Sequence, residues 1–526
     1  MISNEILNGL KEYTANMQVP VTFVLQTGEH HKRQELADFL GEICSVSDSL
    51  ALEERDAGLR SPVSFSIEAD GKATGVQFSG IPGGHEFNSL VLATLQASGT
   101  DIKLDDSLKS LIRRIDEKLR FEVFVSLSCH NCPDVVQALN QFALLSENIT
   151  AEMIDGGEFQ AVVEERDIQG VPSVFLNGEL FANGKVDAAE LIDKLMERNP
   201  ISAEQASSET LPLQDVLVIG GGPAGVSAAI YAARKGLAVT VVADRLGGQV
   251  KDTMGIENFI SMPKTTGPEL TTALARHMED YEITVKEHLH VTDIDKNDIK
   301  TATLSSGERI ETRSIIIATG ARWRELGVPG EKENIGNGVA YCPHCDGPFF
   351  KGKDVAVIGG GNSGIEAALD LAGIVKSVTV LEFMPELKAD RVLVDQAKAR
   401  DNIEIITNAA TTRITAEGGK VDANEYTDRI SGEEHRLRVA GVFVQIGLVP
   451  NTQFLDGVVD LTTHGEVVID EKCKTSEEGI FACGDATTVP YKQIVVAAGE
   501  GSKASLAAFE YLLMHGTPTE EGSLAA

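Results

Sequence analysis

The chain has 526 residues, 42% of them hydrophobic and 24% charged, and its 79 acidic residues against 46 basic ones give a net charge of −33. This length predicts several domains. The acidic balance argues against sequence-independent binding to nucleic acid or to an anionic membrane, which needs clustered Lys and Arg. The charge is typical of a soluble protein, and steering toward a basic partner surface is the alternative.

Seven cysteines are too few for a disulfide scaffold in a chain of this length and indicate redox or metal chemistry in a reducing compartment. The first residues show no basic segment followed by an apolar one, which excludes a secretory signal. No uncharged apolar run reaches the length of a membrane span. We therefore expect a cytoplasmic protein.

Residues 1–196 show one order of elements twice, as a diverged duplication would. Each copy has a short apolar strand, then a helical pattern, then a Gly-apolar-Pro triplet and a closing helix. The strands are expected at 20–26 and 120–126, the helices at 32–44 and 129–145, and the triplets are Gly80-Ile81-Pro82 and Gly170-Val171-Pro172. Alternating strands and helices predict an α/β layer structure in each copy, over 1–103 and 104–196.

Only the second copy carries a Cys-x-x-C pair, Cys129 and Cys132. The matching place in the first copy contains His30 and His31, so the first copy is expected to be a platform with no redox pair of its own. The two histidines are candidate metal ligands, but no Cys or carboxylate stands at ligand spacing beside them. The sequence therefore predicts no metal site.

Residues 197–212 are polar, include Pro200 and Pro212, and show no clear period. A flexible stretch of this size has an end-to-end distance of roughly 20 Å. We expect a linker that lets one domain swing against another, and a rigid helical linker is the alternative.

Two dinucleotide-binding folds follow, because the pattern strand, glycine-rich turn, helix, strand occurs at 216–243 and again at 354–381. The helices are expected at 226–235 and 365–372. The first glycine of such a turn permits the bend, the second lets the backbone approach a pyrophosphate, and the third lets the helix pack on the strand. A purely structural glycine-rich turn is the alternative. The glycines are Gly220, Gly222 and Gly225 in the first fold and Gly359, Gly361 and Gly364 in the second.

An acidic residue at the end of the second strand of such a fold binds ribose hydroxyls. Glu382 holds this place in the second fold and Asp244 in the first. A carboxylate repels the 2′-phosphate of NADPH, and no Arg cluster stands directly beside Glu382. The second fold is therefore expected to bind NADH.

Several motifs resemble the low-molecular-weight thioredoxin reductases: Gly247-Gly248-Gln249, Ile256-Glu257-Asn258-Phe259, Ile317-Ala318-Thr319-Gly320-Ala321, Cys342-Pro343-His344-Cys345-Asp346-Gly347 and Gly484-Asp485-Ala486. The resemblance implies that the first fold, 213–327 with 448–526, binds FAD and that an inserted fold, 328–447, binds the nicotinamide nucleotide. It assigns further flavin contacts to Gly248, Gln249, Asn258, Thr319, Gly320, Asp485, Gln493 and Ile494.

With its N-terminal extension the chain is similar over nearly its whole length to the family of alkyl hydroperoxide reductase F subunits. The resemblance implies tandem thioredoxin-like folds before the two Rossmann-like domains. It also implies an NADH-dependent reductase of a bacterial two-cysteine peroxiredoxin, which supports detoxification of alkyl hydroperoxides and hydrogen peroxide. A homodimer formed through the flavin domain is implied as well.

Cys129 and Cys132 follow a strand and are expected to open a helix, where the helix dipole and free N–H groups stabilise a thiolate. A four-thiolate zinc site and a structural disulfide are the alternatives. The resemblance implies that Cys129 attacks and Cys132 resolves, and that Val171-Pro172 is a cis-proline facing them. It also suggests that Glu86 tunes the Cys129 thiolate, against the alternative of a solvated surface residue.

For the second pair, the resemblance implies that Cys345 faces the flavin, that Cys342 attacks the outgoing disulfide and that Asp346 handles the proton. A purely structural role is the alternative for Asp346. Rotation of the nucleotide domain is expected at hinges near 327–330 and 447–451. The other cysteines, Cys44, Cys473 and Cys483, are expected to be buried apolar residues.

The predicted electron path runs from NADH through FAD and the Cys342/Cys345 pair to the Cys129/Cys132 pair and then to the partner. Three alternatives stay open from the sequence. They are a general disulfide reductase, an NADH oxidase that passes electrons from the flavin to oxygen, and a flavin-loaded redox sensor.

Overall fold

The computed structural model describes residues 2–129, 132–166, 168, 171–183, 186, 188–198, 211–253 and 255–515, without the side chains of residues 252, 344 and 345. Contacts divide the chain into two compact units, one made mainly of Met1–Thr210 and one that begins at Leu211. Most of the expected linker, 197–212, lies outside the described residues. The expected domain boundaries stay predictions.

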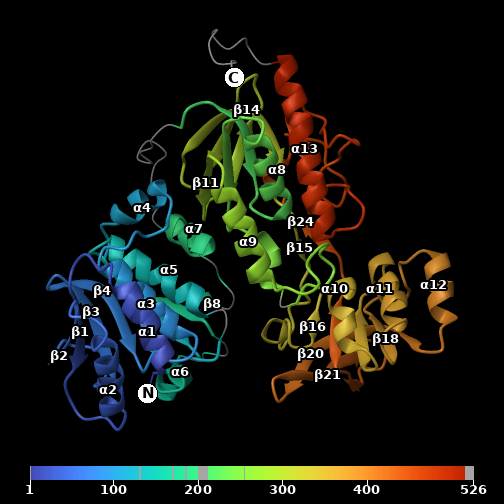
Figure 1. The fold of residues 1–526 in the computed structure, drawn as a ribbon. Coiled ribbons are helices and arrows are strands. Elements are labelled where there is room, and N and C mark those ends of the chain that lie inside the picture. The colour runs from blue at the N-terminus through green and yellow to red at the C-terminus, as the bar shows by residue number, and fades with distance from the viewer. Residues whose placement is uncertain are drawn as a thin grey trace. The chain divides into compact units, whose positions relative to one another are not determined.

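The N-terminal unit is built on one sheet of eight strands in the order β2-β1-β3-β4-β6-β5-β7-β8 (Figure 1). The strands of its first half are β1 (Val21–Gln26), β2 (Leu50–Arg55), β3 (Ser64–Ala69) and β4 (Lys72–Ser79). Those of its second half are β5 (Leu119–Val125), β6 (Ile149–Asp155), β7 (Ser173–Leu176) and β8 (Glu179–Asn183). The helices are α1 (Asn4–Thr14), α2 (Arg33–Cys44), α3 (Glu86–Ala97), α4 (Asp106–Arg113), α5 (Cys132–Leu145), α6 (Gln160–Glu165) and α7 (Ala188–Arg198).

Strand pairing repeats between the halves, which agrees with the duplication expected from the sequence. β1 pairs in parallel with β2 and antiparallel with β3, and β5 pairs in parallel with β6 and antiparallel with β7. The halves are joined where β4 pairs in parallel with β6. One continuous sheet therefore runs through both halves, and β1, β4, β5 and β6 all end at the same edge.

A buried ion cluster lies where the halves meet. The guanidinium of Arg60, from the first half, donates to the carboxylates of Glu152 and Glu122 on β6 and β5. Arg120 and Arg166 also pair with these two nearly inaccessible carboxylates. Buried carboxylates are tolerated only when they are paired and hydrogen-bonded, so these contacts hold the two halves in one register.

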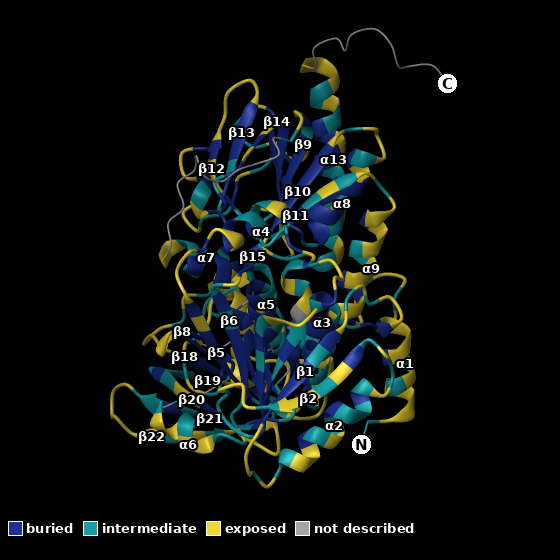
Figure 2. Ribbon diagram, turned by 90° about the vertical axis from the view of Figure 1, so that its left-hand side faces the viewer, coloured by how far each residue is buried: buried dark blue, intermediate teal, exposed yellow. Residues whose placement is uncertain are grey.

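The C-terminal unit begins with a sheet in the order β11-β10-β9-β14-β13-β12, with β25 beside β14. Its strands are β9 (Gln214–Ile219), β10 (Val239–Ala243), β11 (Ile283–Glu287), β12 (Val291–Asp295), β13 (Lys300–Leu304), β14 (Arg309–Ile317) and β25 (Ile480–Ala482). Its helices are α8 (Pro223–Ala233), α9 (Gly267–Glu279) and α13 (Ile494–His515). Helices α8 and α13 pack side by side (Figure 1), and the central strands are buried, in dark blue in Figure 2.

An all-parallel sheet in the order β16-β23-β17-β18-β19 forms the second nucleotide fold. Its strands are β16 (Val339–Ala340), β17 (Asp354–Ile358), β18 (Ser377–Glu382), β19 (Ile403–Thr407) and β23 (Gly441–Val444). Its helices are α10 (Pro343–Asp346), α11 (Asn362–Ala372) and α12 (Arg391–Lys398), and a small sheet of β20 (Ala409–Glu417), β21 (Lys420–Asp428) and β22 (Glu434–Arg438) adjoins it.

Two chain crossings join the nucleotide folds, and they pair with each other as the antiparallel strands β15 (Ala321–Trp323) and β24 (Leu448–Pro450). The expected hinges at 327–330 and 447–451 lie next to or within this ladder. The rotation itself stays a prediction.

Candidate active site

The first glycine-rich turn connects β9 to α8, as the sequence predicted, although the helix begins earlier, at Pro223. A Cβ on Gly220 would lie 2.2 Å from the carbonyl oxygen of Ala318, and one on Gly225 would lie 1.9 Å from that of Gly220. A Cβ on Gly222 would meet nothing within 4 Å. Two glycines are therefore required by the backbone, and the third faces open space at the helix N-terminus.

The second turn repeats this arrangement between β17 and α11. A Cβ on Gly359 would lie 2.3 Å from the carbonyl oxygen of Gln445, and one on Gly364 would lie 1.9 Å from that of Gly359. Gly361 faces open space, like Gly222. Each turn thus leaves room in front of free helical N–H groups, which is how pyrophosphates are held.

The two acidic residues at the strand ends differ in their surroundings. Glu382 is the last residue of β18, and its carboxylate accepts hydrogen bonds from the backbone N–H groups of Gly360 and Met384. Asp244 directly follows β10, is exposed, and lies 3.6 Å from the Nδ1 of His290. The Glu382 carboxylate is therefore fixed against the glycine-rich turn, as a ribose-binding group needs to be.

Cys129 and Cys132 form a disulfide, with their Cα atoms 5.6 Å apart. Cys132 is the first described residue of helix α5 and Cys129 follows β5, and the residues between them are outside the described part. Cys132 is inaccessible, whereas Cys129 is partly exposed. The Cys129 sulfur lies 4.0 Å from the carbonyl oxygen of Val171, and the expected cis bond between Val171 and Pro172 is confirmed.

Glu86 begins helix α3 and is fully buried, which contradicts the alternative of a solvated surface residue. Among the described residues, no donor lies at hydrogen-bond distance and angle from either of its carboxylate oxygens. Burial raises the pKa of Glu86 to about 7; the Ser89 hydroxyl lowers this pKa, and the charge of Asp134 raises it by less. Asp134 is two residues past Cys132, and the side chain of Gln137 donates to the Ser89 hydroxyl, so α3, which Glu86 begins, packs against the helix that carries Cys132.

Cys342 is disulfide-bonded, and the side chain of Cys345 lies outside the described residues. The short helix α10 ends at Asp346, whose backbone N–H donates to the carbonyl of Cys342. Burial raises the pKa of the Asp346 carboxyl to about 6, although its proximity to the Cys342 backbone lowers it slightly. An acid whose pKa is this close to neutrality can give and take protons next to the cysteine.

Comparisons with known proteins agree with this arrangement. The pyridine nucleotide-disulphide oxidoreductase family matches residues 214–501, and a thioredoxin domain matches residues 119–197. The F subunit of alkyl hydroperoxide reductase from Escherichia coli (strain K12) is 47% identical over 98% of this chain and 99% of its own length. The chain belongs to the family of alkyl hydroperoxide reductase F subunits.

A second member, from Staphylococcus aureus (strain NCTC 8325 / PS 47), is 49% identical over 98% of this chain and 100% of its own length. Among solved structures, thioredoxin reductase from Streptococcus pyogenes is 34% identical, with a TM-score of 0.55 over 57% of this chain and 99% of that one. The predicted fold class, tandem thioredoxin-like folds followed by two Rossmann-like domains, agrees with these matches. Enzymes of this kind use FAD and a pyridine nucleotide.

The residues assigned to the flavin fit such a group. The Oγ1 of Thr319 is buried and has no hydrogen-bond partner within the described residues, as expected of a polar group that contacts a cofactor. The side-chain amide of Asn258 donates to the Oε1 of Gln493 at 3.2 Å, which brings two assigned residues together across 235 positions. Asp485 is half-buried, its burial raises the pKa of its carboxyl, and the positive charge of Lys492 opposes this increase.

The other residues assigned to the flavin lie at or near the ends of helices and strands. Gly248 and Gln249 begin a short 3-10 helix, Gly248–Asp252, and Gly320 takes a positive φ of 68° just after β14. Ile494 is the first residue of α13. Loops at element ends are where cofactor contacts of this fold are expected.

Sequence reasoning missed the residues that hold Gln249. In the orientation that satisfies both partners, its side-chain nitrogen donates to the carbonyl of Ala321 and its oxygen accepts from the Nε1 of Trp323, each at 2.8 Å. The Trp323 ring stacks on Tyr341, one residue before Cys342, at a centroid distance of 6.2 Å. The chain's single tryptophan was the available signal, since an indole N–H that is even half-buried usually has a hydrogen-bond partner.

Of the remaining cysteines, Cys473 and Cys483 are buried as predicted, whereas Cys44 is only half-buried, which corrects that part of the expectation. Burial raises the pKa of the Cys44 thiol to about 11. It also raises the pKa values of Cys473, whose sulfur lies 3.1 Å from the Oε2 of Glu500, and of Cys483. These thiols are poor nucleophiles at neutral pH.

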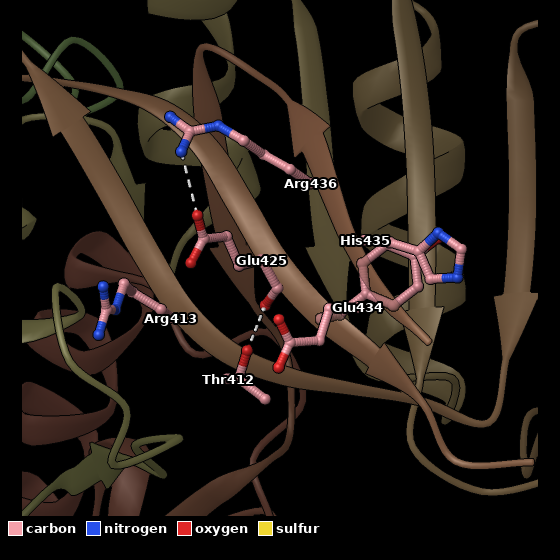
Figure 3. A pocket seen from close by; sticks show the side chains of 7 residues that line it. Thr412, Arg413, Glu425, Glu434, His435 and Arg436 are labelled. Atoms are coloured by element: carbon pink, nitrogen blue, oxygen red, sulfur yellow. Dashed lines mark hydrogen bonds and ion pairs between the residues drawn. The ribbon is translucent and has the colours of Figure 1, made fainter. Parts of the chain in front are cut away.

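A surface cavity of about 530 Å³ lies on the small sheet of β20, β21 and β22 (Figure 3). It is lined by Thr412, Arg413, Glu425, Tyr426, Glu434, His435 and Arg436. Arg436 pairs with Glu425 and with Asp422, so its charge is already compensated. No cysteine or glycine-rich turn is among these lining residues, and we assign the cavity no part in the chemistry.

Proposed function

We propose that this chain is an NADH-dependent flavoprotein that reduces the disulfide of a two-cysteine peroxiredoxin and so supports reduction of alkyl hydroperoxides and hydrogen peroxide. The observation that carries the proposal is the Cys129–Cys132 disulfide, with one partly exposed and one inaccessible sulfur, in the same chain as a second disulfide cysteine and two nucleotide turns. Membership of the family of alkyl hydroperoxide reductase F subunits supports it.

When bound, NADH and FAD supply an electron pair, and the chain's residues direct that pair between sulfur atoms. With the second pair reduced, the Cys342 thiolate attacks Cys129, which forms a mixed disulfide and releases Cys132. Cys345 then attacks Cys342, which closes the Cys342–Cys345 disulfide and leaves Cys129 and Cys132 as thiols. Each exchange breaks one S–S bond and forms one, so the electron pair is conserved.

The last exchange reduces the partner. The Cys129 thiolate attacks the partner's disulfide, and Cys132 resolves the mixed disulfide and restores the Cys129–Cys132 bond. The exposure of the two sulfurs supports this assignment, because an attacking thiol must reach another molecule whereas a resolving thiol need not. The linker expected at 197–212 would allow the N-terminal unit to collect electrons and deliver them.

Two carboxyl groups are suited to the protons that these exchanges release and take up. Asp346, with a pKa of about 6, serves the Cys342/Cys345 pair, and Glu86, with a pKa of about 7, serves Cys129 and Cys132. Both pKa values are raised by burial, so both groups are partly protonated near neutral pH and can protonate a leaving thiolate.

NADH is the proposed donor because Glu382 presents a fixed carboxylate where a 2′-phosphate would have to bind. A cytoplasmic homodimer joined through the flavin domain is likewise proposed on family resemblance. In the described part of the chain, no helix has the length and apolarity needed to cross a bilayer.

Serine at both Cys129 and Cys132 tests the proposal. The double variant should keep NADH consumption with oxygen and lose peroxide reduction in the presence of a two-cysteine peroxiredoxin. Persistence of peroxiredoxin-dependent turnover would favour direct delivery from the second pair. Equal rates with thioredoxin and with a peroxiredoxin in the wild-type protein would favour the general disulfide reductase.

A further inference from the structure

Two histidines and one glutamate, distant in sequence, meet at one edge of the N-terminal sheet. The Nε2 of His30 lies 3.6 Å and the Nε2 of His31 lies 3.7 Å from the Oε1 of Glu158. One ligand atom from each residue lies within 4.8 Å of the other two. No local pattern predicts a carboxylate here, because Glu158 stands far along the chain.

The topology explains the meeting. His30 and His31 follow β1, and Glu158 follows β6. Both strands run in the same direction within the continuous sheet, so their carboxyl ends share one edge. The cluster therefore bridges the two halves of the N-terminal unit. It lies on the same edge as the Cys129–Cys132 disulfide, which follows β5.

We propose that His30, His31 and Glu158 form a binding site for a divalent cation of the zinc class. Two imidazole nitrogens and one carboxylate oxygen are a donor set that zinc and its first-row neighbours prefer, with a further position left for water. The Glu158 side chain is only 8% exposed and so is held in place, whereas that of His31 is 72% exposed and gives access to solvent.

Lys32 is the competitor for this site. Its ammonium pairs with the Oε2 of Glu158, so this carboxylate is already engaged by a positive charge. The backbone N–H of Lys32 also donates to the Nδ1 of His30 at 3.3 Å. Cation binding through Nε2 requires the ring proton on Nδ1, so this long hydrogen bond is given up.

The competition between Lys32 and a cation for Glu158 leads to a specific expectation. A cation at Oε1 would lie close to the Lys32 ammonium, and the two positive charges repel each other. Replacing the amine by a neutral side chain should therefore tighten cation binding, while loss of either imidazole should weaken it. If Glu158 only attracted cations by its charge, replacing Lys32 would tighten cation binding but loss of an imidazole would not weaken it.

The test is calorimetric titration of the oxidised full-length protein with Zn²⁺ alone, so that the paired cysteines cannot ligate the metal. The wild-type protein should bind one Zn²⁺ at this site. His31→Ala, which removes an exposed side chain, and Glu158→Gln, which keeps the shape, should each weaken binding at least tenfold. Lys32→Gln should tighten it severalfold, and His464→Ala, on an exposed loop, should leave it unchanged.

A second readout follows from the bridge between the halves. A cation that binds only the folded unit raises its unfolding temperature. Zn²⁺ should therefore stabilise the wild-type protein and not the His31→Ala variant, although both have the same far-UV circular dichroism. Equal Zn²⁺ affinity in wild type and His31→Ala, no binding by the wild type, or weaker binding by Lys32→Gln would each overturn the proposal.

Discussion

The guanidinium carbon of Arg429 lies 3.8 Å from the centroid of the Phe383 ring, and its Nη1 donates to the Phe383 carbonyl at 2.6 Å. Phe383 directly follows Glu382 of β18, whereas Arg429 directly follows β21. The sequence shows no Arg beside Glu382, so the fold supplies a cation that the local pattern does not show. Because this guanidinium is engaged by the Phe383 ring and carbonyl, we expect the carboxylate of Glu382 to decide between NADH and NADPH.

Replacement of Glu382 by Gln should raise the KM for NADH about tenfold, because a hydrogen bond to a charged group contributes roughly 1.5–3 kcal/mol. The ratio of kcat/KM for NADPH to that for NADH should rise, since the repulsion of the 2′-phosphate is removed. Adding Arg429→Met should leave this rise unchanged, because that guanidinium is already engaged by Phe383. An unchanged cofactor ratio in Glu382→Gln would remove the carboxylate from cofactor selection.

The two glycine-rich turns give matched variants. Gly222→Ala and Gly361→Ala place a methyl group in open space, so both proteins should fold. The first should purify with at least tenfold weaker FAD affinity, and the second should keep its flavin but bind NADH more weakly. Flavin absorbance per chain and NADH titration measure the two effects. Full flavin content in Gly222→Ala would mean that this turn does not hold the pyrophosphate.

Gly225→Ala and Gly364→Ala are the contrasting pair. Their methyl groups would lie 1.9 Å from the carbonyl oxygens of Gly220 and Gly359. The backbone must shift to relieve this overlap, so we expect lower thermal stability as well as cofactor loss. Melting temperatures equal to that of the wild type would contradict the close approach of helix and strand.

The raised pKa of Glu86 predicts that the stability of the folded protein depends on pH. This pKa rises from 4.5 to about 7 on folding, so between these values the folded state binds the proton and the unfolded state does not. Stability therefore falls as pH rises from 4.5 to 7, by up to roughly 3 kcal/mol. Glu86→Gln should remove this fall, and at pH 8 it should raise the urea midpoint of the N-terminal transition.

Urea denaturation at pH 5 and at pH 8 measures this dependence of stability on pH. Unfolding is monitored with a probe that reports on the N-terminal unit alone. The variant and the wild type should differ little at pH 5, where Glu86 is protonated. A constant difference at both values of pH would point to altered packing instead of a titrating carboxyl.

Asp346→Asn should lower the rate of disulfide reduction by about 10²- to 10⁴-fold, the usual contribution of a positioned acid or base. Flavin reduction by NADH in a single turnover should be unaffected, because the carboxyl acts on the cysteines. Rapid mixing separates the two steps. Loss of both steps together would indicate that Asp346 supports the fold and not proton transfer.

Local patterns predicted most of the architecture. The strands before each glycine-rich turn and both Cys-x-x-C pairs could be read from short segments because strand, turn and helix signals act over a few residues. The helices after the turns begin three residues earlier than expected, at Pro223 and Asn362, since each turn itself provides the first helical residues.

Contacts between distant segments could not be predicted. The pairing of β4 with β6, which joins the two halves into one sheet, has no local signal. Glu158 beside His30 and Arg429 against Phe383 depend on the same long-range topology. The buried state of Glu86 was also not readable, because a glutamate at a helix start is ordinarily solvated.

Anaerobic titration with NADH tests the central claim, that two sulfur couples in one chain store the electrons. The wild-type protein should take up about three two-electron equivalents per chain, one for the flavin and one for each cysteine pair. The Cys129→Ser, Cys132→Ser double variant should take up one equivalent fewer. Equal uptake by the two proteins would contradict the account, because the N-terminal disulfide would then lie outside the electron path.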